Sequence, residues 1–126
     1  MANVWPGDGL VDVLGFDIYN EYGWVRNGVS STETVDLGSQ YFAQIQAFAS
    51  AHDVAWGLAE TGYTNASSDI DPQWIARSYD QMVAAGGVAY SYFNTSLNNE
   101  GGTWPLAYGS KTSVYSTILA RSPRLN

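Results

Sequence analysis

The sequence predicts an α/β protein with a parallel sheet, because three strand-like segments alternate with three helix-like segments. The longer loops all follow the strands, and the joins from helix to strand are short. Strands separated by helices pair in parallel through right-handed crossovers. The 126 residues suit one domain, residues 1–126, with the order β-α-β-α-β-α.

The first predicted strand covers residues 10–19, which read LVDVLGFDIY. It is rich in β-branched and aromatic residues, and both of its alternating faces are largely apolar. This pattern is typical of a parallel strand that is covered on both sides. A polar loop follows at residues 20–31.

The first predicted helix covers residues 32–52. Ser30 and Glu33 have the spacing of a capping box at its start. Gly38 weakens the helical pattern of the first turns. The expected apolar stripe consists of Leu37, Tyr41, Ile45 and Phe48, with Phe42 and Ala49 beside it.

The second unit has a strand at residues 54–61, a polar loop at 62–70 and a helix. Asp71 and Pro72 fit the N-cap and the first position of that helix, and Gly86-Gly87 ends it. Its expected apolar face consists of Trp74, Ile75, Tyr79, Met82 and Val83.

The third unit has a strand at residues 88–94, a long loop at 95–108 and a helix at 110–121. The expected buried face of this helix consists of Val114, Tyr115, Ile118 and Leu119. At the other end of the chain, the stretch WPGDG predicts a turn in which Gly7 or Gly9 adopts positive φ.

Composition excludes several function classes. The net charge of -7 opposes binding to nucleic acids and to anionic membranes, and it suits a neutral ligand. No cysteine is present, so there is no disulfide and no thiolate metal site, and no residue pattern indicates a metal or a cofactor. No apolar run reaches 18 residues, the length that a membrane-spanning helix needs. The first residues lack the basic and apolar regions of a signal peptide, and a mature or subcloned fragment would lack them too.

Ligand sites in parallel α/β proteins lie at the carboxyl ends of the strands. This sequence places polar and aromatic residues there: Asp17, Tyr19, Asn20, Glu21 and Trp24 after the first strand, Glu60, Tyr63 and Asn65 after the second, and Asn94, Asn98, Glu100 and Trp104 after the third. Glu60 stands out in the stretch AWGLAETGYT, because a buried carboxylate costs several kcal/mol unless it is paired or hydrogen-bonded. It is either a solvated strand-end acid or a reactive group.

At these residues the sequence resembles a known family. The stretch WPGDGLVDVLGFDIYN resembles the segment that leads through the sixth strand of family 26 glycoside hydrolases, the β-mannanase type. GLAETGYT resembles the seventh strand of the wider clan of retaining glycosidases with (β/α)₈ barrels, and AYSYFN fits the eighth. The resemblance implies a partial TIM barrel, made of the last three of eight consecutive βα units.

The resemblance also implies roles for single residues. Glu60 matches the catalytic nucleophile, and Tyr19 matches the tyrosine that hydrogen-bonds it, which predicts an oxygen–oxygen distance within about 3.5 Å. The expected substrate is an oligo- or polysaccharide with β linkages, and secretion is favoured for the full-length parent. The residues expected to bind the substrate are Asp17, Asn20, Trp24, Tyr63, Asn94 and Trp104. An aromatic residue often forms the floor of such sites, and here the candidates are Tyr92 and Phe93.

One catalytic group is missing from this match. The acid/base glutamate of the clan comes from the fourth strand, which the chain lacks, and Glu100, Glu21 and Asp17 are the nearest substitutes. Three βα units leave open sheet edges, so we expect self-association or a preceding barrel segment in a longer polypeptide. The alternative is a noncatalytic carbohydrate-binding or structural module that kept the fold.

Overall fold

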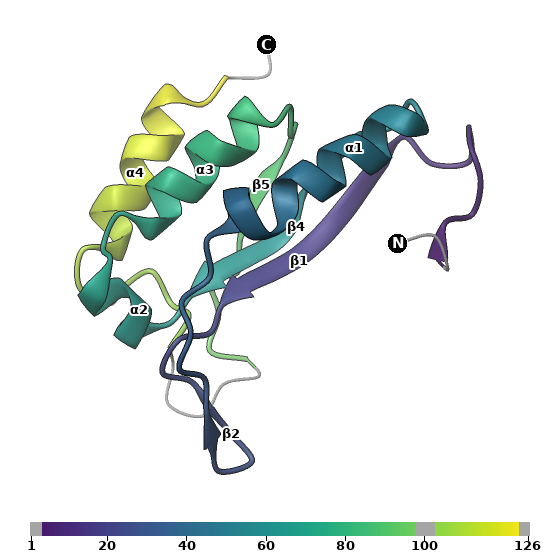
Figure 1. The fold of residues 1–126 in the computed structure, drawn as a ribbon. Helices are drawn as coiled ribbons and strands as arrows, with labels where there is room; N and C mark the ends of the chain where they lie inside the picture. Colours follow the sequence, from purple (N-terminus) through teal and green to yellow (C-terminus); the bar gives the residue numbers. More distant parts are fainter. Residues whose placement is uncertain (1–3, 98–102, 124–126) are drawn as a thin grey trace.

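The computed structural model describes residues 4–97 and 103–123, and there it shows a mixed α/β fold (Figure 1). Strands β1 (Val13–Asn20), β4 (Ala55–Tyr63) and β5 (Tyr90–Tyr92) form one sheet in the order β1-β4-β5. Both neighbouring pairs are parallel. The predicted α/β class and parallel sheet are therefore confirmed.

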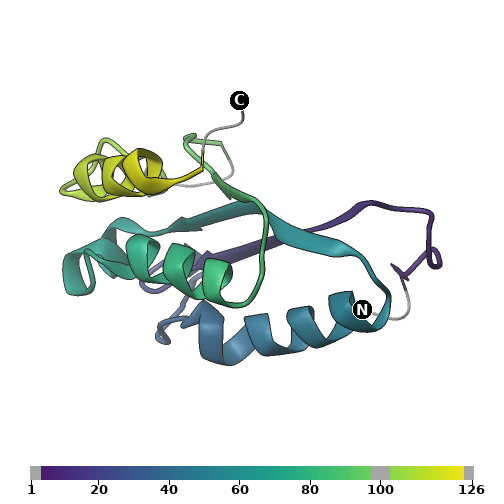
Figure 2. The same cartoon turned by 90° about the horizontal axis from the view of Figure 1, so that it is seen from above.

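Helices cover one face of this sheet. α1 (Ala43–Ala51) and α3 (Trp74–Ala84) lie along that face, and α4 (Lys111–Arg121) packs beside α3 (Figures 1 and 2). The core lies between β4 and the helices, where burial of apolar side chains stabilises the fold. Its most completely buried apolar members include Leu37, Phe42, Ile45, Leu58, Tyr63, Trp74, Ile75 and Ile118.

The other face of the sheet is open in the described part of the chain. On β1, Leu14, Phe16 and Ile18 pack against the core, whereas Val13 and Asp17 on the alternating face are exposed. The expectation that β1 is covered on both sides is wrong for the described residues. The open face is therefore available to carry a site.

The first helix begins later than predicted. Helical structure starts near Leu37 with a π-helical segment, η2 (Gly38–Phe42), and continues as α1. The carboxylate of Asp36, rather than a box of Ser30 and Glu33, accepts a hydrogen bond from the backbone N–H of Ser39 at 2.9 Å. The π-helical turn changes which residues face the sheet, so Phe42 is buried and Tyr41 is exposed.

The loop after β4, predicted as polar and irregular, contains a short helix, α2 (Asn65–Ile70). Thr64 caps it by accepting a hydrogen bond from the N–H of Ser67. The next helix begins at Trp74 and not at Pro72, and the Asp71 carboxylate pairs with Arg77 instead of capping the helix.

The loop after β1 contains a two-stranded hairpin, β2 (Val25–Arg26) and β3 (Val29–Ser30). Its turn residues Asn27 and Gly28 both have positive φ, at 52° and 77°. In the N-terminal turn, Gly7 and Gly9 have φ of 117° and 74°, which confirms that prediction.

The last helix agrees closely with expectation. α4 begins one residue after the predicted start, and Val114 and Ile118 are buried as predicted. Val83 on α3 and Leu119 on α4 are exposed, so these two expectations are wrong. Within residues 4–97 and 103–123, no helix combines the length and the apolar character that a membrane crossing requires.

Candidate functional site

A β-bulge in β4 brings Glu60 to the open face. Leu58 pairs with Phe16, but the next pair joins Glu60 to Asp17, so Ala59 is an extra residue in β4. The alternation of the strand therefore reverses at this point. Trp56 and Leu58 before the bulge, and Thr61 and Tyr63 after it, are the buried residues.

A strand without a bulge would place Glu60 on the same alternating face as Trp56 and Leu58, and that expectation from the sequence is wrong. Strict alternation would have directed Glu60 toward the helices, where a carboxylate is costly. The bulge instead places it beside Asp17, which is exposed, and leaves it half-buried.

Glu60 and Tyr19 form the central contact of the site. The Tyr19 hydroxyl donates a hydrogen bond to Glu60 Oε2 at 2.7 Å, so the predicted contact is confirmed. Burial, together with this hydrogen bond and the negative charges of Glu60 and Asp17, raises the pKa of Tyr19. The hydroxyl therefore stays protonated and acts as a donor at neutral pH.

The rest of the Glu60 carboxylate is free for chemistry. Among the described residues, no hydrogen bond reaches Oε1 and no cation pairs with the carboxylate. A half-buried carboxylate with one neutral donor and one free oxygen can attack an electrophilic carbon or accept a proton.

Aromatic side chains support Tyr19 from two sides. Its ring centroid lies 5.0 Å from that of Trp104 and 5.8 Å from that of Phe93. A Cβ at Gly62 would lie only 3.3 Å from the Tyr19 ring, so the glycine leaves room for the tyrosine. This packing fixes the direction in which the hydroxyl points.

Trp24 and Trp104 lie together but differ in accessibility. Their ring centroids are 5.3 Å apart. Trp104 is buried and supports its neighbours, whereas Trp24 is partly exposed. The guanidinium of Arg26 lies 4.2 Å from the Trp24 ring centroid and also pairs with Glu21 at 3.7 Å. Of the two tryptophans, only Trp24 offers accessible surface to a ligand.

Two predicted substrate-binding residues lie elsewhere. Asn20 is 1% exposed and Tyr63 is completely buried, where its ring stacks on Trp74 on the helix-covered side. They end strands β1 and β4, and the alternation of side chains along each strand directs both residues toward the core. The structure does not bring them to the surface beside Glu60.

The segment after β5 contains Asn94, which is exposed. Its side-chain oxygen accepts a hydrogen bond from the N–H of Leu106 at 3.0 Å, so it also holds the following loop. Glu100 and Asn98, named among the rim candidates, lie outside the described residues.

Sequence reasoning missed Lys111. This residue begins α4, and its side chain is completely buried at the end of β4. Its ammonium donates hydrogen bonds to the carbonyls of Tyr63 and Thr103 and to the side chain of Asn65. A lysine within a polar stretch at a helix start gives no signal of such burial.

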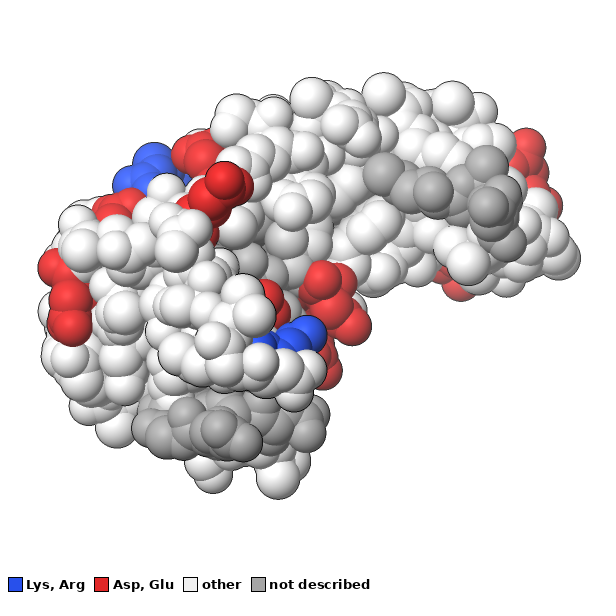
Figure 3. All heavy atoms as spheres, turned by 60° about the horizontal axis from the view of Figure 1, so that its bottom comes forward, with Lys and Arg blue, Asp and Glu red and all other residues white. Residues whose placement is uncertain are grey.

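Acidic residues surround the hollow beside β1. A groove of about 450 Å³ runs along this strand, and its lining includes Asp17, Tyr19, Glu21 and Glu33. Figure 3 shows acidic side chains at a hollow of the face that carries the strand ends, with a basic group beside them. Such a surface disfavours anionic ligands and admits neutral ones.

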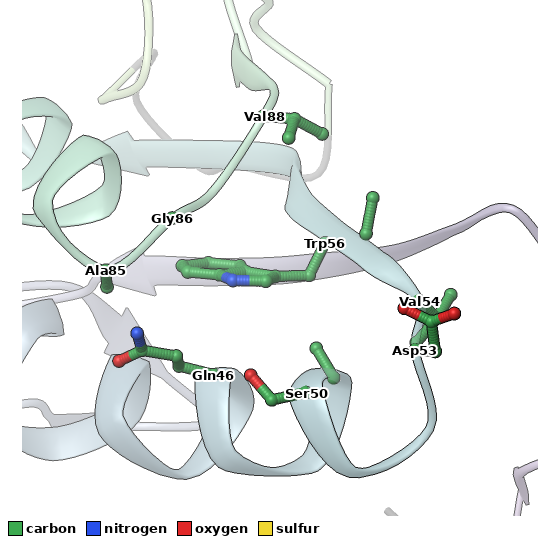
Figure 4. A pocket seen from close by; sticks show the side chains of 10 residues that line it. Gln46, Ser50, Asp53, Val54, Trp56, Ala85, Gly86 and Val88 are labelled. Atoms are coloured by element: carbon green, nitrogen blue, oxygen red, sulfur yellow. The ribbon is translucent and has the colours of Figure 1, made fainter.

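A second hollow, of about 350 Å³, lies between α1 and the segment that follows α3. In Figure 4 the Trp56 indole extends between Gln46 of α1 and Ala85. Trp56 is only 3% exposed and packs against Phe42, so the indole that borders this hollow belongs to the hydrophobic core. No cluster of three or more potential metal ligands occurs among the described residues.

Comparisons of the chain with family models, with curated proteins and with solved structures found no match.

Proposed function

We propose that this chain carries the nucleophile side of a retaining glycosidase site that acts on β-linked polysaccharide. The observation that supports this most is the 2.7 Å hydrogen bond from Tyr19 to Glu60 at the carboxyl end of a parallel sheet. The Tyr19 hydroxyl orients the carboxylate through one oxygen and leaves the other oxygen free to attack, as a nucleophile requires.

The fold is compatible with part of a (β/α)₈ barrel. Helices cover one face, and the open face carries the candidate site, as the inner face of a barrel would. Both edge strands border grooves, of about 450 Å³ beside β1 and about 740 Å³ beside β5. We propose that further barrel strands occupy these edges, contributed by more of the polypeptide or by a second copy.

Retaining hydrolysis needs a second carboxyl group about 5–5.5 Å from the nucleophile, on the other side of the glycosidic bond. Asp17 lies beside Glu60 on the same sheet face, as its register partner. A group in that position is better placed to accept hydrogen bonds from sugar hydroxyls than to protonate a leaving oxygen. We therefore assign Asp17 to substrate binding and the acid to the missing strands.

A substrate that needs no acid tests the nucleophile in this chain alone. In a 2-deoxy-2-fluoro-β-glycosyl fluoride, fluoride leaves as an anion without protonation while the carboxylate oxygen bonds to the anomeric carbon. We expect the β-manno or β-gluco reagent to add one sugar mass to the intact protein. Peptide mapping should place the sugar on Glu60.

Two variants make the result specific. Glu60→Gln should abolish labelling, whereas Asp12→Asn, at an exposed residue just before β1 and at the end of that strand away from Tyr19, should retain it. Labelling at another residue would contradict the proposal. Saccharide binding without labelling would favour the noncatalytic binding module instead, and neither binding nor labelling would end both interpretations.

A further inference from the structure

Lys111 is the only lysine of the chain, and all three N–H donors of its ammonium form hydrogen bonds. Nζ donates to the Tyr63 carbonyl at 2.9 Å, to Asn65 Oδ1 at 2.9 Å and to the Thr103 carbonyl at 2.8 Å. An ammonium has three N–H donors, so each acceptor takes one of them. The three partners belong to the end of β4, the start of α2 and the loop before α4.

A neutral amine could not maintain this arrangement. It has two N–H donors, so loss of one proton leaves one of the three oxygens without its donor. In a site where the side chain is 0% exposed, water does not readily replace the lost bond. The loop carbonyl of Thr103 is the partner whose release changes the site.

Thr103 connects this buried charge to the candidate site. Its hydroxyl accepts a hydrogen bond from the N–H of Asn65 at 2.9 Å, and the next residue is Trp104. The Trp104 carbonyl accepts a hydrogen bond from the Tyr92 hydroxyl at 2.6 Å, and its ring packs against Tyr19. The position of Trp104 therefore depends on contacts at Thr103 and Tyr92.

We propose that Lys111 is a positioning residue, whose charged ammonium holds the Thr103–Trp104 segment so that Trp104 supports Tyr19 against Glu60. This inference rests on the proposed function for the importance of Tyr19 and Glu60. The mechanical part stands on the hydrogen bonds alone. Loss of the Lys111 proton loosens the segment and moves Trp104 relative to Tyr19.

The electrostatic surroundings place this change in an accessible pH range. Burial lowers the pKa of Lys111 to about 8, and the negative charge of Asp69 acts in the opposite direction. The rings of Tyr63 and Tyr108 lie 4.9 and 5.7 Å from Nζ, and the Tyr108 hydroxyl donates to Asp69 Oδ2 at 3.0 Å. Burial raises the pKa of Tyr63, so this phenol remains neutral while Lys111 titrates.

A single lysine allows a direct measurement. Protein labelled with ¹³C-lysine gives one side-chain signal to titrate by NMR, and the five indole N–H signals are followed in ¹⁵N-labelled protein. Comparison with Trp104→Phe assigns the Trp104 indole. We expect the Lys111 signal to titrate with a midpoint near 8 and the Trp104 indole to shift with the same midpoint.

Two variants separate the proposal from general effects of pH. Asp69→Asn removes the neighbouring negative charge and keeps a group that accepts from Tyr108, so it should lower both midpoints together. Asp80→Asn, which breaks the surface pair with Arg121 instead, should leave both midpoints unchanged. In Lys111→Met, if it folds, the Trp104 indole should show no transition near this pH.

The proposal is overturned if the Trp104 indole stays in place while Lys111 titrates, or if Asp69→Asn moves one midpoint without the other. The readout does not use hydrolysis. A shared midpoint without sugar labelling supports the positioning role and refutes the proposed function, whereas labelling without a shared midpoint does the reverse.

Discussion

The two faces of β4 have opposite characters. On the helix-covered face, Trp56, Leu58, Thr61 and Tyr63 are all at most 3% exposed. On the open face, Ala59 is exposed and Glu60 is half-buried, and the glutamate makes one hydrogen bond to its neighbour Tyr19. A single bulge, between Leu58 and Glu60, separates the two patterns and lets one strand serve both the core and the site.

This comparison teaches that stability and chemistry are assigned to different faces. Apolar burial on the covered face provides most of the favourable free energy of folding. The open face carries a carboxylate that remains partly solvated and therefore costs little. Substitutions on the two faces should differ in their effect on the free energy of unfolding.

The largest effect is expected on the covered face. Trp74 is 2% exposed and stacks on Tyr63, so Trp74→Ala should lower the free energy of unfolding by about 3–5 kcal/mol. Urea denaturation measures the change. Trp24→Ala, the matched substitution at a partly exposed tryptophan, should cost clearly less. Equal losses at the two positions would contradict the division between the faces.

The next effect concerns the charge buried at the end of β4. Because burial lowers the folded-state pKa of Lys111 to about 8, the unfolded chain binds more protons than the folded chain above that pH. The wild type should therefore gain stability relative to Lys111→Met as pH rises from about 8, by about 2 kcal/mol over 1.5 pH units. Urea denaturation of both proteins across this range measures the difference. A constant difference would show that the Lys111 pKa is not lowered.

A smaller effect is expected from Gly62→Ala on the open face. The new Cβ would lie 3.3 Å from the Tyr19 ring, so this ring must move by a few tenths of an ångström, whereas the 3.5 Å approach to Trp104 is an ordinary van der Waals contact. We expect a loss of about 1 kcal/mol in the free energy of unfolding, together with a changed near-ultraviolet circular dichroism spectrum. An unchanged spectrum would mean that Tyr19 is not packed as described.

Much of the fold could be predicted from the sequence. Strands β1 and β4 and helices α3 and α4 are periodic segments of at least eight residues, and over that length the period of the apolar residues distinguishes a strand from a helix. The contact between Tyr19 and Glu60 was predictable because both residues end neighbouring parallel strands.

Other features depend on contacts that a single sequence does not reveal. The bulge at Ala59 breaks the period of two, and only the pairing with β1 shows it. The start of η2 is fixed by the carboxylate of Asp36, which is held by Gln81 from another helix. The burial of Lys111 likewise depends on two acceptors far from it along the chain, Tyr63 and Asn65, besides the nearby Thr103. The hairpin is different, because its turn residues Asn27-Gly28 are a recognised hairpin signal in the sequence itself.

The smallest effect on stability is expected at Glu60 itself. Glu60→Gln keeps the shape of the side chain and an oxygen that can accept from Tyr19, so the free energy of unfolding should change by less than about 1 kcal/mol at neutral pH. Urea denaturation measures it. A loss as large as that of a core substitution would place Glu60 in the structural framework and not in a site.

The most direct test of the central claim is the titration of Tyr19. Tyrosines labelled with ¹³C at the ring carbon that bears the hydroxyl are followed by NMR in the wild type and in Glu60→Gln, with Tyr19→Phe identifying the signal. If Glu60 is a carboxylate held by Tyr19, removal of its charge should lower the pKa of Tyr19, while burial keeps it above that of a free tyrosine. The same Tyr19 pKa in both proteins would show that Glu60 is not an ionised partner, and would contradict the account.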